Sequence, residues 1–178
     1  MIDSEIRQQT YQFFLEEAPE LLQILETGLL NLKQKLSPAL VHDLMRAAHS
    51  LKGGAATVGL DALAMIAHRL ESILRGLYSD KVDLDTELET WLLQAYDCLK
   101  EPLQQQINQG SFAEESALAS ADLVFSKIET RLGDILKEAE NYIPSSSDLG
   151  VDMVSSIFEV DVAQGIERLA MVLENPQQ

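Results

Sequence analysis

The sequence has little of several features that mark large classes of protein. It contains one cysteine, so no internal disulfide can form, and its aromatic content of 6% is low for a β-sandwich. No stretch of about 18 residues is free of charge. The first residues show neither the basic start nor the apolar run of a secretory signal. We therefore expect no membrane association and a protein of the reducing cytoplasm.

Positively charged residues are also scarce. Thirteen Lys and Arg residues face 29 Asp and Glu residues, which gives a formal net charge of −16. Most of such a surface would repel a phosphate backbone, so a nucleic acid is not an expected partner. The 178 residues, 46% of them hydrophobic, suffice for a buried core and predict one large domain or one domain with an appendage.

Apolar residues recur three and four positions apart almost throughout, which is the pattern of amphipathic helices. We expect a first helix over about 4–18, with Ile6, Phe13 and Phe14 on its apolar side. Pro19 then either opens a second helix or kinks a longer one. The leucines of this second segment share one face, and they are Leu22, Leu25, Leu29 and Leu32.

Four further helices are expected over about 38–59, 61–79, 86–109 and 112–139. Their ends are marked by capping and terminating residues: Ser37 with Pro38, Gly59, Asp61, Gly110, and Ser111 with Glu114 as a capping box. Their apolar stripes are Leu63, Ile66, Leu70, Ile73 and Leu77; Trp91, Ala95, Cys98 and Leu99; and Leu118, Ala121, Phe125, Ile128, Leu132 and Ile135.

Long amphipathic helices with short connections bury their stripes best as an antiparallel bundle. We predict an all-α fold in which these four helices form the bundle and the N-terminal segment packs alongside. After Glu140 the pattern breaks at Pro144 and three serines. Residues 1–140 are thus expected to be one domain, and 141–178 a linker with short amphipathic helices.

The segment around His49 is the most informative. On a helix that turns by about 100° per residue, His49 lies roughly 140° from the centre of the apolar arc and Gly53 about 180° from it. An imidazole therefore faces outward beside the small residues Gly53, Gly54 and Ala56. Each of two adjacent glycines inside a helix costs roughly 1 kcal/mol of helix stability relative to alanine. Close approach by another molecule would explain why glycines are found there. We assign these three small residues to a docking surface.

The next helix offers groups that could hold the imidazole. His68 and Glu71 are three residues apart, off the apolar stripe, and would border His49 if the two helices are an antiparallel pair. A Glu71 carboxylate that accepts a hydrogen bond from Nδ1–H would leave Nε2 free to attack phosphorus, and Lys52 could pair with phosphoryl oxygens. The sequence shows no nucleotide site, so the phosphoryl donor must come from elsewhere.

The run AAHSLKGGAATVGL, followed by AHRLESIL, closely resembles the histidine-containing phosphotransfer (HPt) domain, in particular the amino-terminal one of CheA-type chemotaxis kinases. The resemblance implies that His49 accepts a phosphoryl group from a kinase catalytic domain and passes it to an aspartate of a response-regulator receiver domain. It further implies that Lys52, His68 and Glu71 support this transfer, and that partner domains supply Mg²⁺ and ATP. The domain would be a carrier rather than an enzyme, within a larger histidine kinase that continues beyond Gln178.

Two alternatives stand beside this interpretation. One is a helical adaptor that only binds partners, although such a protein would have no need for His49 and Lys52. The other is a metal site made by His49, His68 and Glu71, which the charge of Lys52 disfavours. His42, seven residues before His49, lacks the lysine and glycines and is predicted to be an ordinary surface side chain. Cys98 is predicted to serve packing.

Overall fold

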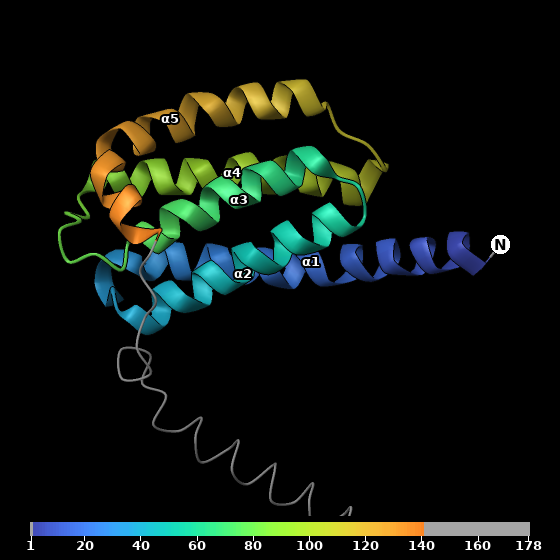
Figure 1. The fold of residues 1–178 in the computed structure, drawn as a ribbon, viewed down its shortest axis with the longest axis horizontal. Helices are drawn as coiled ribbons and strands as arrows, with labels where there is room; N and C mark the ends of the chain where they lie inside the picture. The colour runs from blue at the N-terminus through green and yellow to red at the C-terminus, as the bar shows by residue number, and fades with distance from the viewer. Residues whose placement is uncertain (1, 141–178) are drawn as a thin grey trace, which may run out of the picture. The chain divides into compact units, whose positions relative to one another are not determined.

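The structure, a computed structural model, describes residues 2–140, which belong to one compact unit. Within this range the chain forms helices and no strand, as predicted (Figure 1). The helices are α1 (Ile2–Lys35), α2 (Pro38–Thr57), α3 (Asp61–Gly76), α4 (Thr86–Gln109) and α5 (Glu114–Ala139). The residues after 140, for which we predict a linker, lie outside the described part of the chain.

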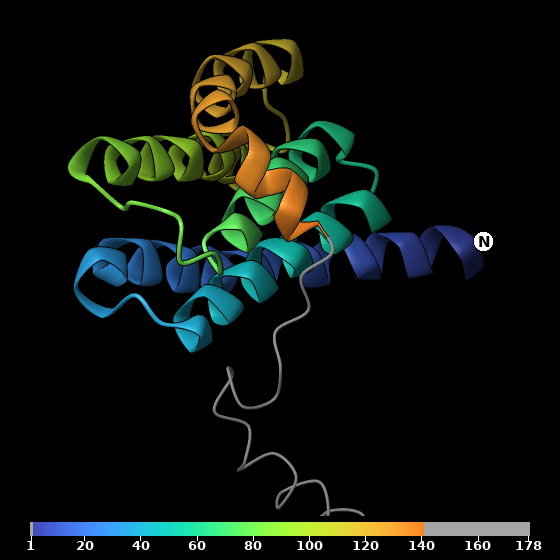
Figure 2. The ribbon, with the colours of Figure 1, turned by 60° about the vertical axis from the view of Figure 1, so that its left-hand side comes forward.

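Consecutive helices run in opposite directions and form a bundle (Figures 1 and 2). Helix α3 packs against α2, α4 and α5, and α1 packs against α2 and α4. Helix α1 therefore lies between α2 and α4 and is part of the bundle, where we had expected it only alongside. Helices α3 and α5 are neighbours that run in the same direction (Figure 1). No helix among residues 2–140 combines the length and the apolar character that a membrane span requires.

The predicted leucine and isoleucine stripes meet in the core. Leu25, Leu44, Leu70 and Ile73 are each completely buried, and they come from α1, α2 and α3. Phe125 is the largest fully buried side chain and comes from α5. Trp91 and Cys98, which we placed on the buried side of α4, are only half-buried. The spacing of apolar residues thus predicted most of the core correctly, but it overestimated the burial of Trp91 and Cys98.

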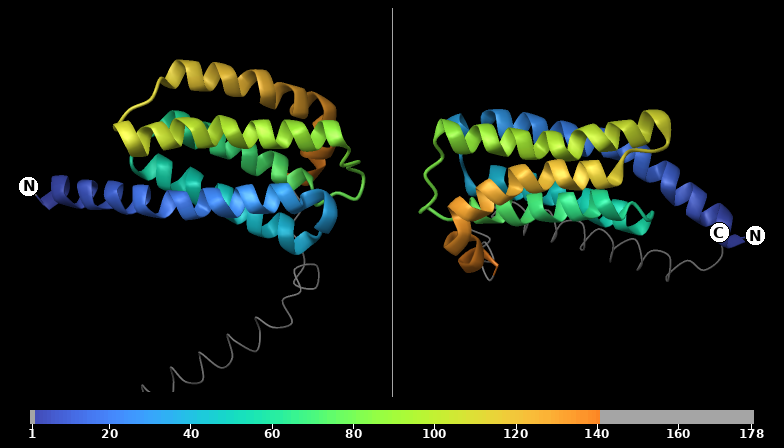
Figure 3. Two further views of the ribbon diagram at one scale, coloured as in Figure 1. Left: turned by 180° about the vertical axis from the view of Figure 1, so that it is seen from behind. Right: turned by 90° about the horizontal axis from the view of Figure 1, so that it is seen from above.

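Helix α1 continues through Pro19 without a break. Of the two possibilities that the sequence left open, the longer helix is therefore the correct one. Proline has no N–H, so the carbonyl four residues earlier has no hydrogen-bond partner within the helix. Pro19 is exposed, and water can therefore solvate that carbonyl. The N-terminal part of α1 extends past the neighbouring helices (Figure 3), and Ile6 and Phe13 on it are exposed, contrary to our prediction.

Some predicted helix ends are confirmed and others are wrong. Ser37 caps α2 by accepting a hydrogen bond from the amide of Leu40, and Gly59 and Gly110 take the left-handed conformation that ends a helix. Asp61 does not cap α3, because it is the first residue of that helix and Leu60 precedes it. The predicted capping box does not form either, since α5 begins at Glu114 after an Ala113 cap.

Helices α1 and α2 approach closely at Gly54. A Cβ atom on Gly54 would lie 2.5 Å from Cδ2 of Phe14, whose ring is almost fully buried. The neighbouring Gly53 faces open space, with nothing within 4 Å of the corresponding position. The two adjacent glycines therefore serve different purposes: Gly54 makes room for α1, and Gly53 leaves an outer surface bare.

A hydrogen-bonded pair fixes α3 against α5. The guanidinium of Arg69 donates two hydrogen bonds of 2.8 Å to the carboxylate of Glu129, and it also lies over the ring of Phe125 at 4.9 Å. Such bidentate arginine–carboxylate pairs are stronger than single neutral hydrogen bonds and also fix the relative orientation of the two side chains. This pair holds the α3 backbone from the side opposite to α2.

The two glycines give a matched test of this packing. We expect Gly53→Ala to raise the free energy of unfolding by up to about 1 kcal/mol, since alanine is the better helix former and its methyl meets nothing. Gly54→Ala gains the same propensity, but overpacking costs about 1–3 kcal/mol, so we expect net destabilisation. Urea unfolding of both variants measures the difference. Equal stability of the two variants would contradict the close packing at Gly54.

Candidate functional site

Helix α2 directs His49 outward. At most 1% of the surface of the neighbouring residues Ala48 and Leu51 is exposed. Their burial fixes the rotation of the helix about its axis. The side chain of His49 is 65% exposed, as its predicted angle from the apolar arc requires. The imidazole is thus accessible to another molecule while its backbone is held in a packed helix.

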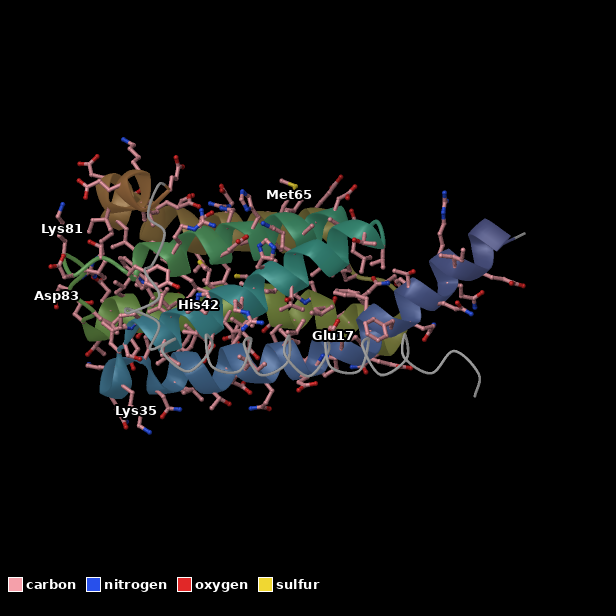
Figure 4. All side chains as sticks on the ribbon, turned by 60° about the horizontal axis from the view of Figure 1, so that its bottom comes forward. Glu17, Lys35, His42, Met65, Lys81 and Asp83 are labelled. Carbon is pink, nitrogen blue, oxygen red and sulfur yellow. The ribbon has the colours of Figure 1, made fainter. Side chains whose placement is uncertain are left out.

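Glu71 reaches His49 from α3. Oε1 of Glu71 lies 2.8 Å from Nδ1 of His49, and Oε2 accepts a hydrogen bond of 2.6 Å from Nζ of Lys52. The side of the bundle formed by α2 and α3 can be followed in Figure 4, where His42 is labelled on α2 and Met65 on α3. The antiparallel pairing of these helices brings together residues 22 positions apart in the sequence.

The contact with Glu71 determines which nitrogen of His49 is free. Only 3% of the surface of Glu71 is exposed, and an ionised carboxylate can accept hydrogen bonds but cannot donate them. Nδ1 must therefore carry the proton in this contact. In the neutral ring, Nε2 then holds a lone pair, and it makes no hydrogen bond within the described residues.

Glu71 is ionised despite its burial. Burial alone would raise the pKa of this carboxyl, but hydrogen bonds from Lys52 and His49 outweigh that effect and hold the pKa below its ordinary value of 4.5. The side chain is therefore a permanent acceptor at neutral pH. It can orient the His49 ring over the whole physiological range.

Two further basic groups approach the same carboxylate. Nδ1 of His68 lies 3.8 Å from Oε2, too far for a hydrogen bond, and the His68 side chain is 65% exposed. Nη2 of Arg75 lies 3.5 Å from Oε1. Arg75 was missed by the sequence analysis, although its position four residues after Glu71 on one helix was a usable signal.

The predicted docking residues separate into two groups. Gly53 and Ala56 are exposed on the outer side of α2, one and two turns beyond His49. Gly54 instead faces Phe14 of α1, as described above. The absence of a side chain at Gly54 thus has a packing cause, and we no longer include Gly54 in the docking surface.

The remaining two candidates have ordinary surroundings. His42, predicted to be a surface residue, is half-buried, and its Nδ1 lies 3.2 Å from the hydroxyl of Tyr78. No carboxylate partner of the kind that holds His49 is found beside it among the described residues. Cys98 is half-buried and burial raises the pKa of its thiol, which fits packing better than reactivity.

The alternative of a metal site has no geometric support in residues 2–140. Nowhere in this range do three His, Cys, Asp or Glu side chains converge in a way that could hold a metal ion. The Lys52 ammonium also lies against Oε2 of Glu71, where a metal ion would have to bind. The Lys52 ammonium thus supplies positive charge to this carboxylate.

Comparison with known proteins places this chain in a family. The family model described as the Hpt domain matches residues 9–109, from α1 to the end of α4. The chain is 31% identical over 134 residues to the chemotaxis protein CheA of Treponema pallidum, covering 75% of this chain. It is 40% identical over 96 residues to CheA of Klebsiella aerogenes, covering 52% of this chain. In both cases it spans only 14% of the relative's length.

A solved structure agrees with this match. The phosphorylated P1 domain of CheA3 in complex with CheY6 from R. sphaeroides superimposes with a TM-score of 0.59 at 26% identity. The similarity covers 68% of this chain and 97% of that domain. The matched range contains His49, Lys52, His68 and Glu71. The chain belongs to the Hpt family, the histidine-containing phosphotransfer domains, and is similar to those of CheA.

Proposed function

We propose that His49 is the residue that carries the phosphoryl group in this phosphotransfer domain. The observation that supports this most strongly is the contact of 2.8 Å between Nδ1 of His49 and the buried carboxylate of Glu71. It holds the ring in the tautomer whose Nε2 is nucleophilic, on a side chain that is largely exposed. Of the three described histidines, His49 alone combines a largely exposed side chain with a ring nitrogen within hydrogen-bond distance of an ionised carboxylate.

The transfer consists of two substitutions at phosphorus. In the first, the Nε2 lone pair forms an N–P bond while the bond between the γ-phosphorus of ATP and its bridging oxygen breaks, and ADP leaves with those electrons. In the second, a carboxylate oxygen of a regulator aspartate bonds to phosphorus and the N–P electrons return to Nε2. Glu71 keeps the proton on Nδ1 through both steps, and Lys52 offers positive charge to the phosphoryl oxygens.

The domain would not catalyse the first step by itself. We propose that a histidine-kinase catalytic domain brings ATP and Mg²⁺, and that a response-regulator receiver domain brings the accepting aspartate with its own Mg²⁺. Both partners fit the likeness to CheA, of which the chain spans a small part. Because ATP is an intracellular donor, the cytoplasm is the proposed location.

We propose that the regulator approaches along the outer face of α2. Gly53 and Ala56 carry little or no side chain and are exposed, so a partner surface can come close to Nε2 of His49. The exposed side chain of His49 lies one helical turn before Gly53 on the same helix. A regulator pocket could thus close over the imidazole without displacing a bulky group.

The assignment of His49 is tested by labelling. With a CheA-type kinase domain and ATP as donor, we expect His49→Gln to abolish the acid-labile, base-stable phosphoryl label while leaving the helical content measured by circular dichroism unchanged. His42→Gln serves as the matched control on the same helix and should keep the label. A label that persists in the His49 variant would place the phosphoryl group elsewhere.

The bare surface is tested at Gly53. We expect Gly53→Leu to slow transfer from phosphorylated His49 to a receiver domain by about tenfold or more, since the new side chain stands where the partner must approach. The position faces open space, so the variant should remain folded. Gly53→Ala, which adds a single methyl, is the control and should transfer nearly as fast as the original protein. An unchanged rate in the leucine variant would rule out the proposed approach.

The ionised state of Glu71 predicts a pH dependence of stability. A carboxyl whose pKa is lowered by folding stabilises the protein above its ordinary pKa of 4.5, and this contribution is lost as the pH falls through the folded-state pKa. At about pH 7 we expect Glu71→Gln to cost about 1.5–3 kcal/mol, the range for hydrogen bonds to charged groups.

The difference in unfolding free energy between Glu71→Gln and the original protein should therefore shrink as the pH falls below 4.5. Urea titrations at several pH values measure it. Glu138→Gln is the control, because Glu138 pairs with Lys81 on the exposed surface and its loss should change stability little at any pH. A difference that stays constant from neutral to acid pH would contradict the ionised pairing of Glu71.

A further inference from the structure

Arg75 belongs to the cluster around Glu71 but has no part in the mechanism described so far. Its Nη2 lies 3.5 Å from Oε1 of Glu71, against a usual length of about 2.7–2.9 Å for a charged hydrogen bond. A side-chain movement of under about 1 Å would complete this bond. Arg75 is only partly exposed and follows Glu71 by one turn of α3, so it stays within reach of the carboxylate.

Phosphorylation of His49 would change the demand for positive charge at this site. The phosphoryl group adds about two negative charges at Nε2. Lys52 carries a flexible cation three residues after His49, on the same side of α2. In the present state its ammonium lies 2.6 Å from Oε2 of Glu71, so it can reach a phosphoryl group only by leaving the carboxylate.

Glu71 cannot easily be left without a cation. Its side chain is 4% exposed, and a buried carboxylate that loses its partner takes up a proton instead. A protonated Glu71 would no longer be a pure acceptor for Nδ1–H, and the orientation of the imidazole would be lost. A second cation must therefore replace Lys52 if the carboxylate is to stay ionised.

We propose that Arg75 is this second cation: when Lys52 turns from Glu71 to the phosphoryl group on His49, Arg75 closes on the Glu71 carboxylate and keeps it ionised. This inference rests on the proposed function and makes Arg75 a positioning residue that acts through Glu71. The other titratable group close to the carboxylate, His68, lies 3.8 Å away, which is beyond hydrogen-bond distance. No cation of α4 or α5 pairs with Glu71 within residues 2–140.

The test compares two variants of Arg75 in two states of the protein. The full chain, with its glutamates labelled with ¹³C at the side-chain carboxyl, is phosphorylated with potassium phosphoramidate, which needs no kinase. The carboxyl resonance of Glu71, assigned by its loss in Glu71→Gln, is then recorded by NMR on a freshly phosphorylated sample at each pH, because the N–P bond of phosphohistidine is labile in acid. Nitrogen-15 spectra of the imidazole establish that the label is on Nε2 of His49.

We expect Arg75→Gln to titrate Glu71 at nearly the same pH as the original protein when neither is phosphorylated, because Lys52 still holds the carboxylate. In the phosphorylated form its midpoint should be higher by about one pH unit or more. Arg75→Lys should restore most of this difference. Arg69→Gln is the matched control: it removes an arginine of the same helix that pairs with Glu129, so it should lower stability without moving the midpoint of Glu71.

Three results would overturn the inference. One is an equal midpoint for the phosphorylated forms of Arg75→Gln and the original protein. The other is a midpoint shift of the same size without phosphorylation, which would make Arg75 a permanent partner rather than a replacement. The third result comes from variants that need no phosphoryl group. In a Lys52→Met background, Arg75→Gln should by itself raise the pH midpoint of Glu71. An unchanged midpoint in that background would overturn the inference. Failure to label His49 in the original protein would instead contradict the proposed function.

Discussion

The hydrogen bond between the imidazole of His49 and the carboxylate of Glu71 is the contact through which the packing of the helices determines the reactivity of the histidine. An exposed histidine by itself rotates freely and exchanges its proton between two nitrogens. Here a nearly buried acceptor on a second helix fixes both the ring and the proton. The bond is useful only because α2 and α3 keep their mutual register, and that register depends on the apolar core beneath them and on the Arg69 pair at the far side of α3.

The burial of Glu71 has two opposite effects that the cluster balances. Removing the carboxylate from water gives it fixed neighbours and a fixed orientation, but it also favours the protonated form. Lys52 and His49 offset that tendency by donating to separate oxygens. The site thus resembles a small buried ion pair in which each partner would be costly to remove alone. Such an arrangement restricts the positions that the surrounding side chains can adopt.

Much of this could be predicted from the sequence, because the signals were local and repeated. The leucine spacing identified the helical faces, and the His-Ser-Leu-Lys-Gly-Gly run identified the family. The antiparallel pairing of two adjacent helices was enough to bring Glu71 to His49. The sequence did not reveal the packing role of Gly54, because that role depends on Phe14, which lies on another helix. It also left open whether α1 continues through Pro19, and it placed the start of α5 at 112 instead of Glu114.

The contact between Phe14 and Gly54 also constrains how α1 can sit on α2. The aromatic ring occupies a gap that exists because position 54 has no side chain. If α1 slid along α2 by one helical turn, about 5.4 Å, the ring would meet Ser50 or Val58 instead and find no gap. The fit of Phe14 against Gly54 therefore fixes the position of α1 along the axis of α2. A homologous chain with a larger residue at this position would have to tilt or shift its first helix to accommodate it.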